Sequence, residues 1–167
     1  MHHSQNGDGK NRAPSTRFTP PTPAEEREVK IIAALAGRYD QLDALWQHAE
    51  EDLRRFRLHN PVQTAPFKSF PLFDNDYEER GPRQYHMLGF LRCGKNWRIC
   101  YGVYHDPVNG PDEEPHWTPI SDCSVDLRVE VIPVFEELRK KVVETAEQSV
   151  PKLDKALEKF REILDLF

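Results

Sequence analysis

The sequence contains no apolar run that approaches the roughly 18 residues a helix needs to cross a membrane. Its first residues, Met1 to Ser4, have neither the basic start nor the apolar centre of a secretion signal. We therefore expect a cytoplasmic protein without a membrane partner.

Cysteine is also scarce. The chain has Cys93, Cys100 and Cys123, an odd number that lacks the CxxC spacing of zinc and redox sites. This pattern is consistent with the reduced thiols of a cytosolic protein. We expect no metal and no cofactor, and we interpret the three cysteines as small buried hydrophobic side chains.

Familiar catalytic motifs are missing as well. The sequence has no HExxH, no GxSxG and no glycine-rich phosphate loop. Its formal net charge is -5, and it contains no long basic run. Proteins that bind a phosphate backbone use clustered Lys and Arg. We therefore do not expect a nucleic-acid partner.

The segment from Gln84 to Tyr104 is the one place where two apolar runs flank a tight polar turn. Gly94 and Asn96 tolerate the positive φ angles of a short loop. Every other residue of the second run is large and apolar, which places one row of side chains on one face of a strand: Trp97, Ile99, Tyr101 and Val103. The segment predicts a β-hairpin over residues 84–104.

The length of the hairpin loop decides which side chains of the first strand share a face with this apolar row. An even loop puts Leu88 and Phe90 there, whereas an odd loop puts Met87, Leu91 and Cys93 there. The sequence leaves both registers open. Either register leaves apolar groups on the second face, and a lone hairpin is only marginally stable. We therefore expect cover on both faces, with helices on at least one.

A long helix is predicted from Pro23 to Leu58. Thr22 can cap it, proline suits the first helical position, and early glutamates complement the helix dipole. Gly37 is a weak point, because glycine costs about 1 kcal/mol against alanine inside a helix. The apolar residues recur at steps of three and four: Val29, Ile32, Ala36, Tyr39, Leu42, Trp46, Ala49, Leu53 and Phe56.

Three other segments are predicted to lack helices. Residues 1–22 have few large apolar side chains to offset the entropy of ordering, so we expect a disordered tail. Residues 59–83 contain several prolines and predict a connector with at most one edge strand. Residues 105–122 are acidic and rich in proline, and they predict a long loop whose far end can form a short strand.

Residues 123–167 predict a kinked helical arm. Residues 124–132 fit a strand or a helix, and we favour a helix because their apolar phase continues across Pro133. A kink is predicted at Pro133, and a second break or bend at Pro151. Beyond Pro133 an apolar row recurs at helical spacing: Leu138, Val142, Ala146, Leu153, Leu157, Phe160 and Leu164.

Together these elements predict one α+β domain over residues 23–167. Its two long helical segments pack on a small antiparallel sheet built from the hairpin, and a disordered tail precedes them. Such helices exceed what one hairpin can cover. Part of the apolar row should therefore remain for a partner.

The best catalytic grouping comprises His105, Asp106, His116 and Cys123, in or near the acidic loop. A cysteine and a histidine can form a nucleophile and its base, with an aspartate that orients the imidazole. Two histidines and an aspartate can equally hold a divalent metal. Neither grouping carries a motif, so enzymatic activity is uncertain and not the interpretation we favour.

The pattern favours a non-catalytic cytoplasmic interaction or regulatory module that binds a protein partner or a second copy through its amphipathic helices. The alternative is a small enzyme, or a protein that binds a metal or ligand with residues 105–123. The candidate interaction residues lie on the helical arm and on the hairpin: Leu153, Leu157, Phe160, Leu164, Trp97 and Tyr101.

Overall fold

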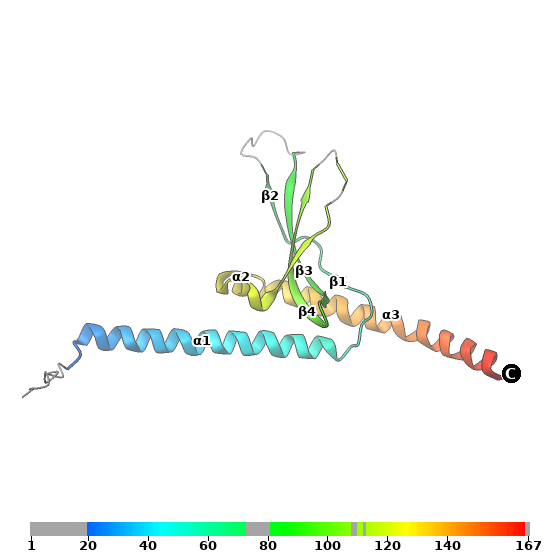
Figure 1. The fold of residues 1–167 in the computed structure, drawn as a ribbon, viewed down its shortest axis with the longest axis horizontal. Coiled ribbons are helices and arrows are strands. Elements are labelled where there is room, and N and C mark those ends of the chain that lie inside the picture. The colour runs from blue at the N-terminus through cyan, green and yellow to red at the C-terminus, as the bar shows by residue number, and fades with distance from the viewer. Residues whose placement is uncertain (1–19, 73–80, 108–109, 112, 166–167) are drawn as a thin grey trace, which may run out of the picture. The chain divides into compact units, whose positions relative to one another are not determined.

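Helices and a five-stranded antiparallel sheet make up the described part of the chain, which confirms the predicted α+β class (Figure 1). The chain forms two compact units, Met1–Gly37 and Arg38–Phe167. The disordered tail predicted for residues 1–22 lies almost entirely outside the described residues. The computed structural model describes residues 20–72, 81–107, 110–111 and 113–165.

The first helix, α1 (Pro23–Arg54), begins at the residue that the sequence predicts. A capping box holds this end of the helix. The Glu25 N–H donates to Thr22 Oγ1 at 3.3 Å, and the Thr22 N–H donates to Glu25 Oε2 at 2.6 Å. The helix then continues through Gly37 without a break.

The predicted end of this helix at Leu58 is wrong, because α1 ends at Arg54. Its last turn closes with tighter hydrogen bonds, including one from the Arg57 N–H to the Arg54 carbonyl at 3.1 Å. Arg57 has a φ of +50°, the left-handed conformation that ends many helices. Leu58 is buried, so it joins the core from beyond the helix.

The predicted hairpin is formed by β3 (Arg83–Cys93) and β4 (Asn96–Asp106), and both strands extend past the predicted limits of 84–104. Its loop has two residues, so the even register holds: Leu88 lies opposite Tyr101, and Phe90 lies opposite Ile99. Gly94, the first loop residue, has a φ of +62°. Glycine at that position is the requirement of a type II′ turn.

The sheet is larger than the predicted hairpin. β1 (Val62–Gln63) and β2 (Lys68–Pro71) pair with β3, and β5 (His116–Pro119) pairs with β4. The predicted connector and the predicted acidic loop therefore both contribute strands. β2 and β5 each end in a proline, which an edge strand accepts because its outer side needs no backbone donor.

The predicted helical arm consists of two helices, α2 (Val125–Glu130) and α3 (Ile132–Asp165). The helix favoured for residues 124–132 is confirmed, and Ser124 caps it by accepting from the Leu127 N–H at 3.3 Å. Pro133 lies in the first turn of α3, where its missing N–H costs nothing. The predicted kink is therefore a boundary between two helices.

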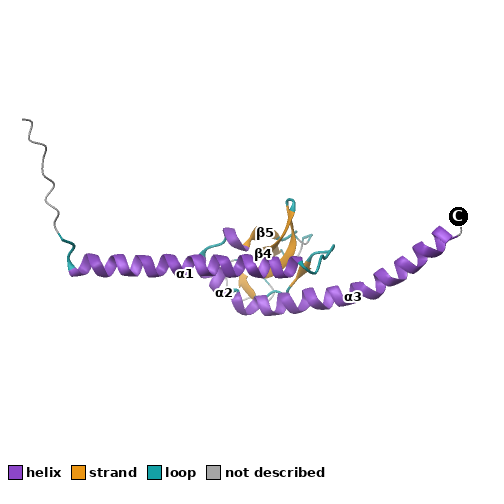
Figure 2. Ribbon diagram, turned by 90° about the horizontal axis from the view of Figure 1, so that it is seen from below, coloured by secondary structure: helices purple, strands orange, loops and turns teal. Residues whose placement is uncertain are grey.

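Pro151 lies inside α3 and does not break it. The helix curves along its length (Figure 2). Just before the proline, the hydroxyls of Thr145 and Ser149 donate to the carbonyls of Lys141 and Thr145 at 2.7 Å and 2.8 Å. Proline and such back-bonding hydroxyls both bend helices. Within the described residues, no helix combines the length and the apolarity that a membrane span requires.

One face of the sheet carries the main core. Leu88, Phe90 and Ile99 are almost completely buried on it. They share one apolar cluster with side chains from the second half of α1, the junction between α2 and α3, and the first half of α3: Trp46, Leu53, Val131, Leu138 and Val142. This face is therefore covered by the second half of α1 and the first half of α3.

The second face is covered by Trp117 of β5. Its ring lies so close to Gly89 and Gly102 that an added Cβ would fall 2.8 Å and 2.5 Å from ring carbons. Cys100 is fully buried, as predicted for the cysteines, but Cys93 and Cys123 are only half-buried. Expected cover on both faces is thus confirmed, although a strand residue supplies it on the second.

Candidate interaction surface

The second half of α3 presents an exposed apolar row, which we call the distal α3 face. Its residues recur at steps of three and four, the heptad spacing of helices that pack in pairs. Each side chain is more than half exposed, and residues 150–165 are exposed throughout. The row consists of Val150, Leu153, Leu157, Phe160 and Leu164.

The same helix buries its first half. Leu138 and Val142 have no exposed surface, and Ala146 packs partly against the core. The change from buried to exposed falls where Thr145, Ser149 and Pro151 favour a bend. Beyond that point α3 leaves the sheet (Figure 2). One apolar row therefore serves the core at its start and remains without cover at its end.

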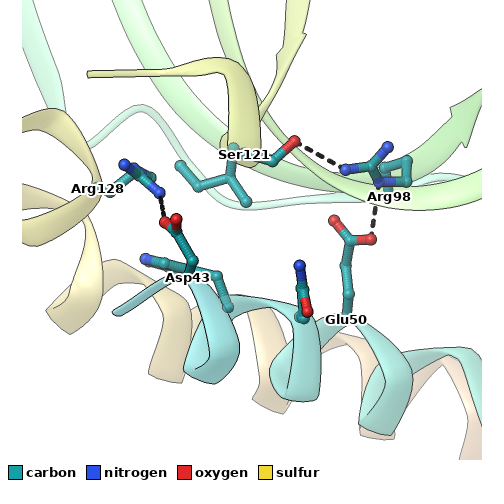
Figure 3. Close-up of a pocket in the computed structure, with 8 residues that line it drawn as sticks. Asp43, Glu50, Arg98, Ser121 and Arg128 are labelled. Carbon is teal, nitrogen blue, oxygen red and sulfur yellow. Dashed lines mark hydrogen bonds and ion pairs between the residues drawn. The ribbon is translucent and has the colours of Figure 1, made fainter. Parts of the chain in front are cut away.

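A buried ionic network anchors α1 to the sheet. Glu50 is 5% exposed, and its Oε1 accepts from Arg54 Nη2 at 2.5 Å. The same oxygen accepts from Arg98 Nε at 2.7 Å (Figure 3). Its Oε2 accepts from the Ile99 N–H at 3.2 Å, on the edge of β4 that β5 leaves unpaired. The hydrogen bond that Arg98 donates to Glu50 raises the pKa of Arg98 above the ordinary arginine value.

A small cavity of about 130 Å³ adjoins this network. Arg128 forms an ion pair with Asp43 across it, and Arg98 Nη2 donates to Ser121 Oγ at 2.8 Å (Figure 3). Arg128 Nε and Trp46 Nε1 are buried and have no partner among the described residues. A polar cavity of this size accommodates water. Its acidic and basic side chains already pair, so we assign it to the anchoring of α1 and α2.

The four candidate catalytic residues are divided between two ends of β5. His116 pairs with Val103 at the start of the strand, and His105 lies on β4 beyond that point. Cys123 follows η1 (Ile120–Asp122) at the other end, where its Sγ lies 3.5 Å from the Pro119 carbonyl. Burial raises the pKa of Cys123, which disfavours a nucleophilic thiolate.

Two of the four candidates, His105 and Asp106, lie at the open end of the hairpin. His105 Nδ1 is 3.1 Å from Glu113 Oε2, and Asp106 lies opposite Arg83 in the ladder. Among the residues that the structure describes, no group of three His, Cys, Asp or Glu side chains is arranged to hold a metal. The catalytic grouping stays a prediction.

The two hairpin residues predicted for interaction have different environments. Trp97 is half-buried, packs on Phe90 with ring centroids 5.4 Å apart, and accepts from Arg54 Nε through its carbonyl at 2.8 Å. Tyr101 is buried, and its hydroxyl forms a hydrogen bond with His86 Nδ1. Burial raises the pKa of Tyr101 to about 12, so it stays protonated.

His86 gives the core a predicted pH dependence. Burial lowers its pKa below 6.5, and Lys68 and His105 add to this effect while Glu130 opposes it. The unfolded chain then binds more protons than the folded chain just below pH 6.5, so stability is full above that pH and falls as the pH decreases. We expect chemical unfolding to show a lower free energy at pH 5 than at pH 7.5.

His86→Gln should flatten this dependence, because it removes the titrating group. His116→Gln is the matched control, since His116 is exposed at the edge of the same sheet. A parent and a His86→Gln variant with equal slopes of unfolding free energy against pH would contradict the assignment.

Sequence reasoning missed the network around Glu50. A signal was present, because Glu50 follows Trp46 by one helical turn and precedes Leu53 by about another, on the buried side of the predicted helix. A glutamate on an apolar face needs a buried cationic partner. The identity of that partner depends on which strand the helix meets, and the pattern does not contain that information.

Comparisons with protein-family models, with curated proteins and with solved structures find no match to this chain. Its function must therefore be argued from the chemistry of its own surfaces. Among the features of this subsection, the distal α3 face is the one that presents a row of exposed apolar side chains.

Proposed function

We propose that this chain is a non-catalytic protein-interaction module that associates with itself through the distal α3 face. The observation that carries the proposal is the division of a single apolar row. Its first half is buried in the chain's own core, and its second half is exposed at heptad spacing. Contiguous apolar patches on an otherwise polar surface mark sites of interaction.

The stability of the helix supports the same proposal. Residues 150–165 have exposed side chains throughout, so the described part of the chain supplies little tertiary packing to this stretch of α3. Isolated helices of such length are marginal in water even with favourable sequences. A partner helix would supply the missing packing, because burial of a Leu or Phe side chain contributes about 1.5–3 kcal/mol.

We place this module in the cytoplasm. The three free thiols support that assignment, since proteins of oxidising compartments usually pair their cysteines. Cys93 Sγ and Cys100 Sγ lie 3.2 Å apart as thiols.

Leu157→Asp tests the proposed surface. Each dimer would lose two buried leucines and gain two desolvated carboxylates. We therefore expect the dissociation constant of the dimer to rise by at least about 100-fold, which corresponds to about 3 kcal/mol. Sedimentation equilibrium of the full chain measures this change directly. Lys155→Asp is the matched control, because it introduces the same side chain two residues away on the outer face of α3.

Circular dichroism of both variants checks that the body of the protein stays folded. If Leu157→Asp associates as strongly as the parent and as Lys155→Asp, the distal α3 face is not the surface of self-association.

A further inference from the structure

We infer that the partner of the distal α3 face is a second copy of the same segment, paired in antiparallel orientation with Asp154 opposite Arg161 of the second copy. This inference rests on the proposed function and adds an orientation and a register to it. The residues that flank the apolar row determine both.

Heptad positions follow from the row itself. The steps of three and four place Val150, Leu157 and Leu164 at a, and Leu153 and Phe160 at d. These positions form the seam between two helices, and positions e and g border it on either side. The residues at e and g therefore decide which orientation of the partner is favoured.

The two flanks differ in chemistry. Position e carries Asp154 and Arg161, which have opposite charges, whereas position g carries Ser149, Ala156 and Ile163, which have none. Neither Asp154 nor Arg161 forms an ion pair within the part of the chain that the structure describes. Their charges remain available to a partner.

Orientation follows from which flanks meet. In a parallel pair each e flank faces a g flank, so Asp154 and Arg161 would meet only uncharged side chains. In an antiparallel pair e faces e and g faces g. Asp154 of each copy then lies opposite Arg161 of the other, which gives two ion pairs related by the two-fold axis.

The same register also brings apolar side chains together along the seam. It layers Leu157 on Phe160 of the second copy and Leu153 on Leu164, and it sets the small Ala156 against the larger Ile163. These pairs fill space in a complementary way. All of them come from residues exposed in the single chain.

A register shifted by one heptad is less favourable. It would layer Val150 on Phe160 and place Asp154 opposite Asp154 of the second copy, a repulsive contact that offsets the pairing of Arg161 with Glu147 in that register. It would also bring Ala146 into the seam, although Ala146 packs partly against its own core. We therefore commit to the register that pairs Asp154 with Arg161.

Charge reversal tests this arrangement. Asp154→Arg or Arg161→Asp alone turns both ion pairs into like-charged contacts, and we expect each to weaken the dimer by about tenfold at low salt. The double variant Asp154→Arg/Arg161→Asp should recover the parent affinity to within about threefold. An equimolar mixture of the two single variants should associate more tightly than either variant alone, because all four charges then pair.

Two reversals on the outer face are the controls: Glu158→Arg matches Asp154→Arg, and Lys155→Asp matches Arg161→Asp. Analytical ultracentrifugation at low and high salt gives the dissociation constants. A parent dimer that neither single reversal weakens would overturn the antiparallel pairing and leave the proposed function intact. Weakening by Arg161→Asp but not by Asp154→Arg would overturn the register. A monomeric parent would instead overturn the proposed function.

Discussion

Glu50→Ala is expected to lower the free energy of unfolding by about 3 kcal/mol, the range found when one partner of a buried ion pair is removed. The variant leaves Arg98 and the Ile99 N–H without their acceptor at the edge of β4. It also removes one of the two partners of Arg54, which would keep its bond to the Trp97 carbonyl. Denaturant unfolding of the full chain measures the loss.

Two further variants separate the causes. Glu50→Gln keeps an oxygen for the Ile99 N–H but removes the charge, so its loss should be smaller than that of alanine. Glu51→Ala is the matched control, because Glu51 is the exposed neighbour on the same turn, and its effect should stay within about 0.5 kcal/mol. Equal effects of Glu50→Ala and Glu51→Ala would show that the network does not anchor α1.

Gly102→Ala is expected to destabilise the protein by about 1–3 kcal/mol, the usual cost of overpacking. The added Cβ would fall 2.5 Å from Trp117 Cζ3, so the indole ring or β5 must move. Loss of that cover would expose the second face of the sheet. Thermal unfolding and tryptophan fluorescence report the two effects separately.

A second substitution tests whether the indole ring of Trp117 causes this loss. Trp117→Leu removes the clashing atoms, so the double variant should be less destabilised than the sum of the two single variants. Gly37→Ala is the matched control, since an added Cβ meets nothing within 4 Å there and alanine favours a helix. Additive losses in the double variant would contradict close packing of Trp117 on Gly102.

The sequence predicted the parts of the fold that depend on local chemistry. The capping residues Thr22 and Glu25 mark the start of α1, and the alternation around Ile99 marks β4. It allowed one edge strand in the connector and a short strand at the far end of the acidic loop, but it did not locate β1, β2 or β5, because short edge strands take their structure from the strand they join. The end of α1 was also missed, since the left-handed Arg57 is not a residue type that signals a helix end.

For the distal α3 face too, the sequence predicts the local pattern but not which part of it is covered. The spacing of Leu153, Leu157 and Phe160 predicts an apolar row, as it does for Leu138 and Val142. Which half of the row meets the sheet depends on how far the sheet extends along α3. That extent is a tertiary property, and only the fold shows that cover ends near Pro151.

If the distal α3 face joins two copies of the chain, the molar mass in solution must depend on concentration. Light scattering coupled to size-exclusion chromatography, repeated over a range of loading concentrations, measures this most directly. We expect a molar mass that rises with concentration toward twice the 19.5 kDa of one chain. A mass that stays at 19.5 kDa up to the solubility limit would contradict it.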